Sequence, residues 1–268
     1  MQNREPAKRC PDSRLLPIGN PSRACCSAHG GGPDAAPAHA ADVVSSNIVG
    51  YEKVSLSANA YYLSGIQFVK VGGEQGTLND LFSATDIPYG TVIQFLNEEG
   101  MYDLYTYLEE AYDAEADDFV PGWGDGGEEL VVDPTPPGTG FWIKSPENYE
   151  LAQSGEVSSA TAITLEVPAG AYTMISNPFP DGFNPNAVTW SDNLEYGTVI
   201  QVLNDQGMYD LYTYLEEAYD PETDDFVPGW GDGGEELVSS SITTSPAQGV
   251  WIKSDKAVTL TVTLPSAN

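Results

Sequence analysis

The sequence predicts an all-β protein with two tandem antiparallel modules, each a β-sandwich or barrel with short helical turns. A long segment of the chain occurs twice at a fixed distance. The composition, with 15 tyrosines, 27 glycines and 20 prolines among 268 residues, is typical of short strands joined by turns. Apolar and polar residues alternate within the duplicated segment, which favours strands over helices.

The duplication defines two copies of one module. Residues 89–131 recur as residues 196–238, a constant offset of 107 residues with five differences. Weaker matches pair residues 61–68 with 172–179, and residues 140–145 with 249–254. We therefore expect a first copy over residues 48–157 and a second over residues 160–268, each large enough to bury a small core.

A β-hairpin is expected at the centre of each copy. In the first copy, residues 90–96 form a short apolar run, residues 97–100 supply a turn, and residues 101–108 alternate Tyr, Leu and Thr with polar residues. A helix running from Leu104 to Ala111 is the alternative. Because Tyr and Thr are poor helix formers and Gly100 precedes the segment, the pattern favours strands.

Further elements flank the hairpin. Residues 141–144 and the Thr/Val alternation of residues 258–264 predict two more strands. Residues 79–85 and 184–193 are each expected to hold one helical turn.

The leader, residues 1–41, differs from the rest of the chain. It mixes Pro, Gly, Ala, Ser and Arg without apolar periodicity, so we expect it to be disordered. The string Ala38-His39-Ala40-Ala41 has the A-x-A form of a signal-peptidase site, although no apolar stretch precedes it. The leader is therefore interpreted as a flexible tail or a misread signal peptide.

The charge of the chain is strongly acidic. The whole chain holds 40 acidic and 10 basic residues. Three acidic and five basic residues precede residue 42, which leaves 37 acidic residues against five lysines, a net charge of −32. Such a surface repels nucleic-acid phosphates and anionic lipids, so we expect no nucleic-acid partner. No apolar run approaches the roughly 18 residues of a spanning helix, so no membrane insertion is expected.

Several kinds of catalytic site are excluded from the two copies. Both histidines and all three cysteines lie in the leader, so the copies hold no Ser-His-Asp triad, Cys-His pair or zinc site with nitrogen and sulfur ligands. Glycine-rich phosphate loops are also absent from the sequence. Paired carboxylates remain, and these are the groups that a glycosidase uses.

An acidic, glycine-rich segment is the candidate metal site in each copy. Calcium binds six to eight oxygen ligands in flexible loops, and acids spaced by glycines supply such ligands. A solvated acidic loop is the favoured alternative, and calcium is the only cofactor that the sequence suggests. The candidate ligands are Asp117, Asp118, Asp125 and Glu128, with Asp224, Asp225, Asp232 and Glu235 in the second copy.

The tryptophans offer a candidate carbohydrate site. Trp123 and Trp230 lie beside the acidic segments, where an exposed indole would stack on a sugar ring. A place in the core is the favoured alternative for both. Trp142 and Trp251 lie inside apolar runs and are expected in the core.

The combination of these motifs resembles a known group of proteins. The strand 172–179, the central G-T-x-I hairpin and the closing G-x-G-F-W-I-K string of residues 138–144 resemble a β-rich module of exported bacterial surface proteins. Residues 42–51, D-V-V-S-S-N-I-V-G-Y, are similar to the mature N-terminus of such proteins. The second copy departs from the pattern, with Val250 in place of Phe141. The resemblance implies a secreted or cell-surface location and an adhesive or structural role.

Three functions are therefore carried forward. The first is a non-enzymatic exported surface or matrix protein, adhesive or structural and stabilised by calcium, which contacts surface components or glycans. The second is a carbohydrate-binding module, and the third is a carboxylate-based glycosidase. Because neighbouring copies of near-identical sequence exchange strands readily, a domain-swapped dimer is also expected.

Overall fold

The computed structural model describes residues 49–233, 235–238 and 242–265. The all-β prediction is confirmed, because these residues form fifteen strands and a single α-helix of four residues. All the sheets are antiparallel. The predictions for residues 1–41, including the A-x-A string, lie outside the described residues.

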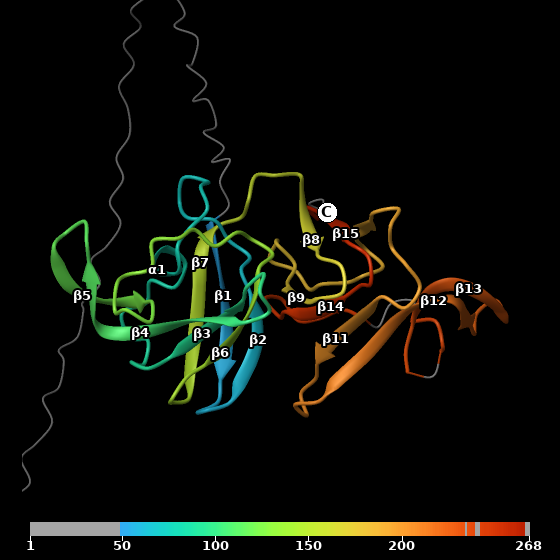
Figure 1. Cartoon of the computed structure of the whole chain (residues 1–268), viewed down its shortest axis with the longest axis horizontal. Coiled ribbons are helices and arrows are strands. Elements are labelled where there is room, and N and C mark those ends of the chain that lie inside the picture. The colour runs from blue at the N-terminus through green and yellow to red at the C-terminus, as the bar shows by residue number, and fades with distance from the viewer. Residues whose placement is uncertain (1–48, 234, 239–241, 266–268) are drawn as a thin grey trace, which may run out of the picture. The chain divides into compact units, whose positions relative to one another are not determined.

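The first copy is a β-sandwich of two layers (Figure 1). One layer is a five-stranded sheet in the order β2-β6-β3-β4-β5. Its strands are β2 (Tyr61–Gly65), β3 (Val92–Leu96), β4 (Tyr102–Asp113), β5 (Asp118–Gly124) and β6 (Gly140–Lys144). The other layer pairs β1 (Val49–Leu56) with β7 (Tyr149–Glu156), which run side by side.

The second copy has the same five-stranded sheet as the first, but a different layer covers it. The sheet has the order β13-β12-β11-β14-β9. Its strands are β9 (Tyr172–Ile175), β11 (Val199–Leu203), β12 (Tyr209–Asp220), β13 (Asp225–Gly231) and β14 (Val250–Lys253). The covering layer has three strands: β8 (Ala162–Val167), β10 (Thr189–Trp190) and β15 (Val258–Thr263).

The central hairpin forms where the sequence predicts it, between β3 and β4. The side chain of Asn97 accepts hydrogen bonds from the backbone N–H groups of Glu99 at 3.1 Å and Met101 at 2.9 Å. Gly100 has a φ of 76°, which favours glycine. The helical alternative over residues 104–111 is wrong, since β4 continues to Asp113 by pairing with β5.

The two predicted helical turns have different outcomes. In the first copy α1 (Leu78–Leu81) begins after Thr77, whose side chain exchanges hydrogen bonds with Asp80 in a capping box. In the second copy residues 184–193 form turns and the short strand β10, so that prediction is wrong. Ala187 stands at the position of Asp80 and has no carboxylate to complete the cap.

Each copy has its own hydrophobic core between its layers. The fully buried residues of the first core include Ile66, Phe141 and Ile143, and those of the second include Phe179, Phe183 and Leu260. Aliphatic and aromatic burial of this kind is the main stabilising contribution to such a fold.

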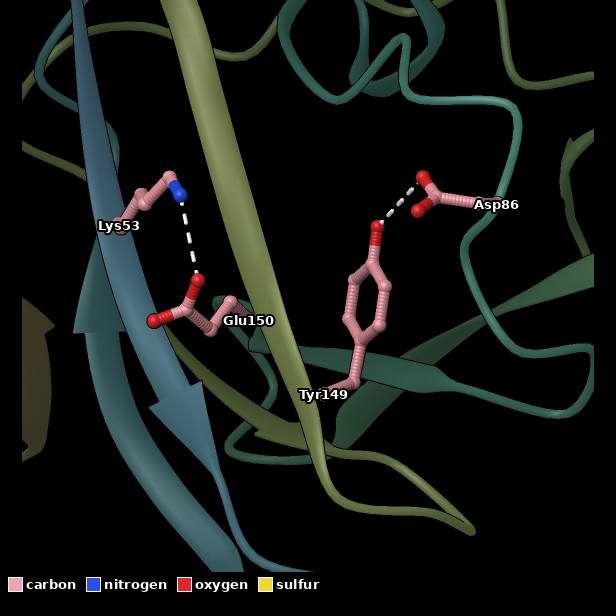
Figure 2. A network of polar contacts seen from close by, with 4 residues as sticks. All are labelled: Lys53, Asp86, Tyr149 and Glu150. Carbon is pink, nitrogen blue, oxygen red and sulfur yellow. Dashed lines mark hydrogen bonds and ion pairs between the residues drawn. The ribbon is translucent and has the colours of Figure 1, made fainter. Parts of the chain in front are cut away.

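Strand β7 carries polar contacts on both sides (Figure 2). Glu150 forms an exposed ion pair with Lys53 of β1 at 3.1 Å. Tyr149 turns the other way and donates to a carboxylate oxygen of Asp86 at 3.0 Å. Burial and the Asp86 carboxylate raise the pKa of Tyr149 to about 12.

The copies also contact each other through reciprocal positions. Ser64 of β2 forms a β-bridge with Gln248, and Ile175 of β9 forms one with Thr139. Ser64 and Ile175 occupy matching positions in the two copies, as do Thr139 and Gln248. The contacts therefore follow the pattern of a two-fold interface within one chain.

Candidate functional site: two aromatic sheet faces

The structure places Trp123 and Trp230 in the two cores. Their side chains are 0% and 2% exposed. Trp123 packs edge-on against Tyr107, and Trp230 packs against Tyr214, with ring centroids 5.5 Å and 5.4 Å apart. Neither indole presents a face to solvent, so the sugar-stacking role considered for these two residues is corrected to a core role.

Trp142 and Trp251 take the opposite position. They are half-buried on the outer side of the sheets rather than in the core, which corrects the expectation for both. The reason is strand alternation, since Phe141 and Ile143 on either side of Trp142 are fully buried. In the string F-W-I-K this alternation turns Trp142 and Lys144 away from the core.

Each five-stranded sheet therefore presents an outer face of one recurring composition. Cross-strand pairing aligns Trp142 with Gln94, and Gln94 with Leu104, on that side. Leu104 is 52% exposed, which is high for a leucine. The outer face of the first copy includes Tyr61, Gln94, Tyr102, Leu104, Trp142 and Lys144. The outer face of the second includes Tyr172, Gln201, Tyr209, Leu211, Trp251 and Lys253.

The ring geometry is alike on the two faces. Tyr61 meets Trp142 edge-on, with centroids 6.1 Å apart and planes at 80°. Tyr172 meets Trp251 at 5.9 Å and 87°. The ammonium group of Lys253 lies 5.5 Å from the centre of the Tyr172 ring, a cation–π distance.

A hollow of about 510 Å³ lies against the outer face of the second copy. Tyr102 and Leu96 of the first copy lie on one side of it. The residues of the second copy that line it include Tyr172, Gln201, Tyr209 and Trp251. Half of the residues that line it are thus aromatic.

Polar groups of this hollow are held by hydrogen bonds. The side-chain amide of Gln201 donates to the hydroxyl oxygen of Tyr172 at 3.2 Å. Burial raises the pKa of Tyr209, the indole N–H of Trp251 acts against that rise, and Tyr102 adds to it. Tyr209 is therefore a neutral donor and acceptor at physiological pH.

The acidic segments adopt a different structure from the loops expected. Much of each segment is strand, β5 or β13, and the acids beside the turns bond to nearby groups of the same hairpin. Asp117 accepts from the Tyr112 hydroxyl at 2.8 Å, and Asp125 accepts from the Gly127 backbone at 2.8 Å. Asp118 accepts from the backbone of the next residue.

The second copy uses its acids in the same way. Asp224 accepts from Tyr219 at 3.0 Å, Asp225 from the backbone of Phe226, and Asp232 from the backbone of Glu236. Glu128 and Glu235 have φ values of 66° and 64° in turns. Within the described part of the chain, the structure brings together no group of three or more acidic, His or Cys side chains suited to a metal.

Comparisons of the chain with protein-family models, curated proteins and solved structures gave no match. Within the described residues, no helix has the length and apolar character needed to cross a membrane.

Proposed function

We propose that the chain is a non-enzymatic, exported surface or matrix protein with an adhesive or structural role, and that it contacts its partner through the two outer faces. The observation that supports this most is the position of Trp142 and Trp251, partly buried on the outer side of the sheets and each beside an exposed tyrosine. Aromatic residues with an apolar body and a polar tip are enriched at binding surfaces.

The repetition of the face supports an adhesive role. Where the copies have diverged, Tyr61, Trp142 and Lys144 still recur as Tyr172, Trp251 and Lys253, while the inward Phe141 becomes Val250. Two similar faces on one chain bind a repetitive surface with higher avidity than one face alone.

Retention of the full chain on immobilised extracellular polymers tests this proposal. We expect retention on at least one polysaccharide or matrix protein, and its loss in the double variant Trp142→Ala/Trp251→Ala. The matched control is Phe119→Ala/Phe226→Ala, which removes two exposed rings from the hairpin arms away from the outer faces. No retention on any polymer, or equal retention of the two double variants, would overturn the proposal.

A carbohydrate-binding module is the second candidate. The observation that favours it is the amide of Gln201 beside the rings of Tyr172 and Trp251, because stacked rings and amide groups together recognise sugars. In this version Trp251 takes the stacking role first considered for Trp230.

A further inference from the structure

We infer that the hollow on the second copy binds a neutral glycan, with one sugar ring stacked on Trp251 or Tyr172. The inference rests on the proposed function, because it names the ligand class of one of the two outer faces. The equivalent face of the first copy is assigned only a general contact role.

The size and walls of the hollow fit a short saccharide. Its volume of about 510 Å³ lies within the range of about 300–1,000 Å³ that small-ligand sites occupy. Tyr102, Tyr172, Tyr209 and Trp251 all line it. Tyr172 and Trp251 stand nearly perpendicular, at 87°, so a sugar stacked on one ring meets the edge of the other.

The polar groups match sugar hydroxyls. Gln201 uses one amide hydrogen on Tyr172, and a primary amide has a further donor and an acceptor oxygen. The phenol of Tyr209 is neutral, so it donates and accepts as a hydroxyl does. Sugars present apolar C–H faces together with hydroxyl edges. In this hollow the aromatic rings suit the C–H faces, and the polar groups of Gln201 and Tyr209 suit the hydroxyls.

The charge of the protein selects against anionic glycans. The two copies carry 37 acidic residues and five lysines, so the potential around the site repels uronates and sulfates. Lys253 is the lysine of this face, and it lies over the Tyr172 ring. A neutral hexose polymer is therefore the favoured ligand class.

The first copy differs at the corresponding place. A wider hollow of about 690 Å³ lies beside Tyr61, and its lining includes the charged residues Glu52, Lys53 and Asp205. Trp142 does not line it. Stacking in a shaped hollow is therefore a property of the second copy, and the two tryptophans are expected to respond differently to substitution.

Isothermal titration of the full chain with neutral hexasaccharides of glucose, mannose and galactose tests the inference, with an oligouronate as the charged probe. We expect binding of at least one neutral glycan and none of the uronate. Trp251→Ala and Tyr172→Ala should each weaken binding roughly tenfold or more. The exposed-arm control Phe226→Ala should change it less than twofold.

The outcomes separate the inference from the proposed function. Binding that survives Trp251→Ala, or that favours the uronate, overturns the inference. A chain that is retained on a matrix protein through its outer faces but binds no neutral glycan also overturns the inference, and leaves the proposed function standing. A chain retained on no polymer overturns both. Circular dichroism of each variant confirms that the β fold is intact.

Discussion

The two copies share a sheet and differ in what covers it. Strands β3 to β5 and β11 to β13 come from nearly identical sequence and have the same lengths and pairing. The covering layer is two strands with a helical turn in the first copy and three strands in the second. The comparison teaches that the covering layer tolerated change while the outer aromatic face of the sheet recurred.

The core tryptophans show how the covering layers differ. In the first copy Phe82, directly after α1, meets Trp123 edge-on at 6.1 Å. In the second copy Trp190 of β10 lies tilted against Trp230 at 5.4 Å, and a hollow of about 420 Å³ remains beside the pair. The same sheet residue is thus enclosed in one copy and lies beside an opening in the other.

The largest expected effect comes from removing these indoles. Trp123→Ala should lower the free energy of unfolding by about 3–5 kcal/mol, and Trp230→Ala by less, because the space left by Trp230 joins the adjoining hollow, where water and neighbouring side chains can fill it. Urea unfolding followed by circular dichroism measures both. An equal or larger loss for Trp230→Ala would contradict the difference that we draw between the copies.

Trp123→Phe is the matched control for the first copy. The indole N–H of Trp123 has no hydrogen-bond partner among the described residues, so a phenyl ring loses only packing volume. Its cost should be well below that of Trp123→Ala.

A second prediction concerns the contact between the copies. A Cβ on Gly249 would lie 2.6 Å from the carbonyl oxygen of Ser64, which is too close. Gly249→Ala should therefore loosen the contact and split the thermal transition into two. A single unchanged transition would show that this contact does not couple the copies.

The domain-swapped dimer expected from the repeat would use the same contacts between two chains. Refolding over a range of concentrations, followed by sizing with light scattering, should show a dimer fraction that rises with concentration. Monomer at every concentration would contradict the prediction.

A smaller loss of stability is expected at Tyr149, where only the first copy has a hydrogen bond to Asp86. The bond from Tyr149 to Asp86 occurs in the first copy, whereas Val258 and Asn193 occupy the matching positions of the second. Tyr149→Phe should cost about 0.5–1.5 kcal/mol, the usual worth of such a bond.

The pH dependence follows from the raised pKa of Tyr149. Folding raises it from 10.0 to about 12, so its contribution to stability is complete below pH 10 and is lost as the pH rises toward 12. Between these values the melting temperature of Tyr149→Phe should fall less steeply than that of the wild type. Parallel curves would contradict this assignment.

The smallest expected effect is that of calcium. The aspartates first considered as ligands accept hydrogen bonds from tyrosine hydroxyls and turn backbones in both copies. At matched ionic strength, calcium and chelator should therefore give the same melting temperature. A rise that disappears in Asp117→Asn/Asp224→Asn would restore calcium as a stabilising ligand by mass action.

Local patterns in the sequence predict the hairpin well. The turn around Asn97 and Gly100 and the alternation after it identify β3 and β4, because both signals act within a few residues. The sequence also indicates that the second copy has no helix near residue 187, because Ala187 stands where the first copy has the capping Asp80.

The tryptophan positions illustrate what a broad composition argument misses. An apolar run suggests burial for Trp142, yet strict alternation with Phe141 and Ile143 places it outside. Trp123 stands among glycines and acids, and its burial depends on α1 and Phe82, which are distant in sequence. The hollow beside Trp251 also needs residues from both copies, so no local pattern predicts it.

Mapping of tryptophan oxidation by mass spectrometry tests the central claim most directly, because it reports which indoles are accessible and which a ligand covers. We predict rapid oxidation at Trp142 and Trp251, protection at Trp123 and Trp230 until the fold melts, and new protection of Trp251 when a ligand binds. Oxidation of Trp123 or Trp230 in the folded chain as fast as Trp142, or a bound ligand that leaves Trp251 as reactive as before, would contradict the account.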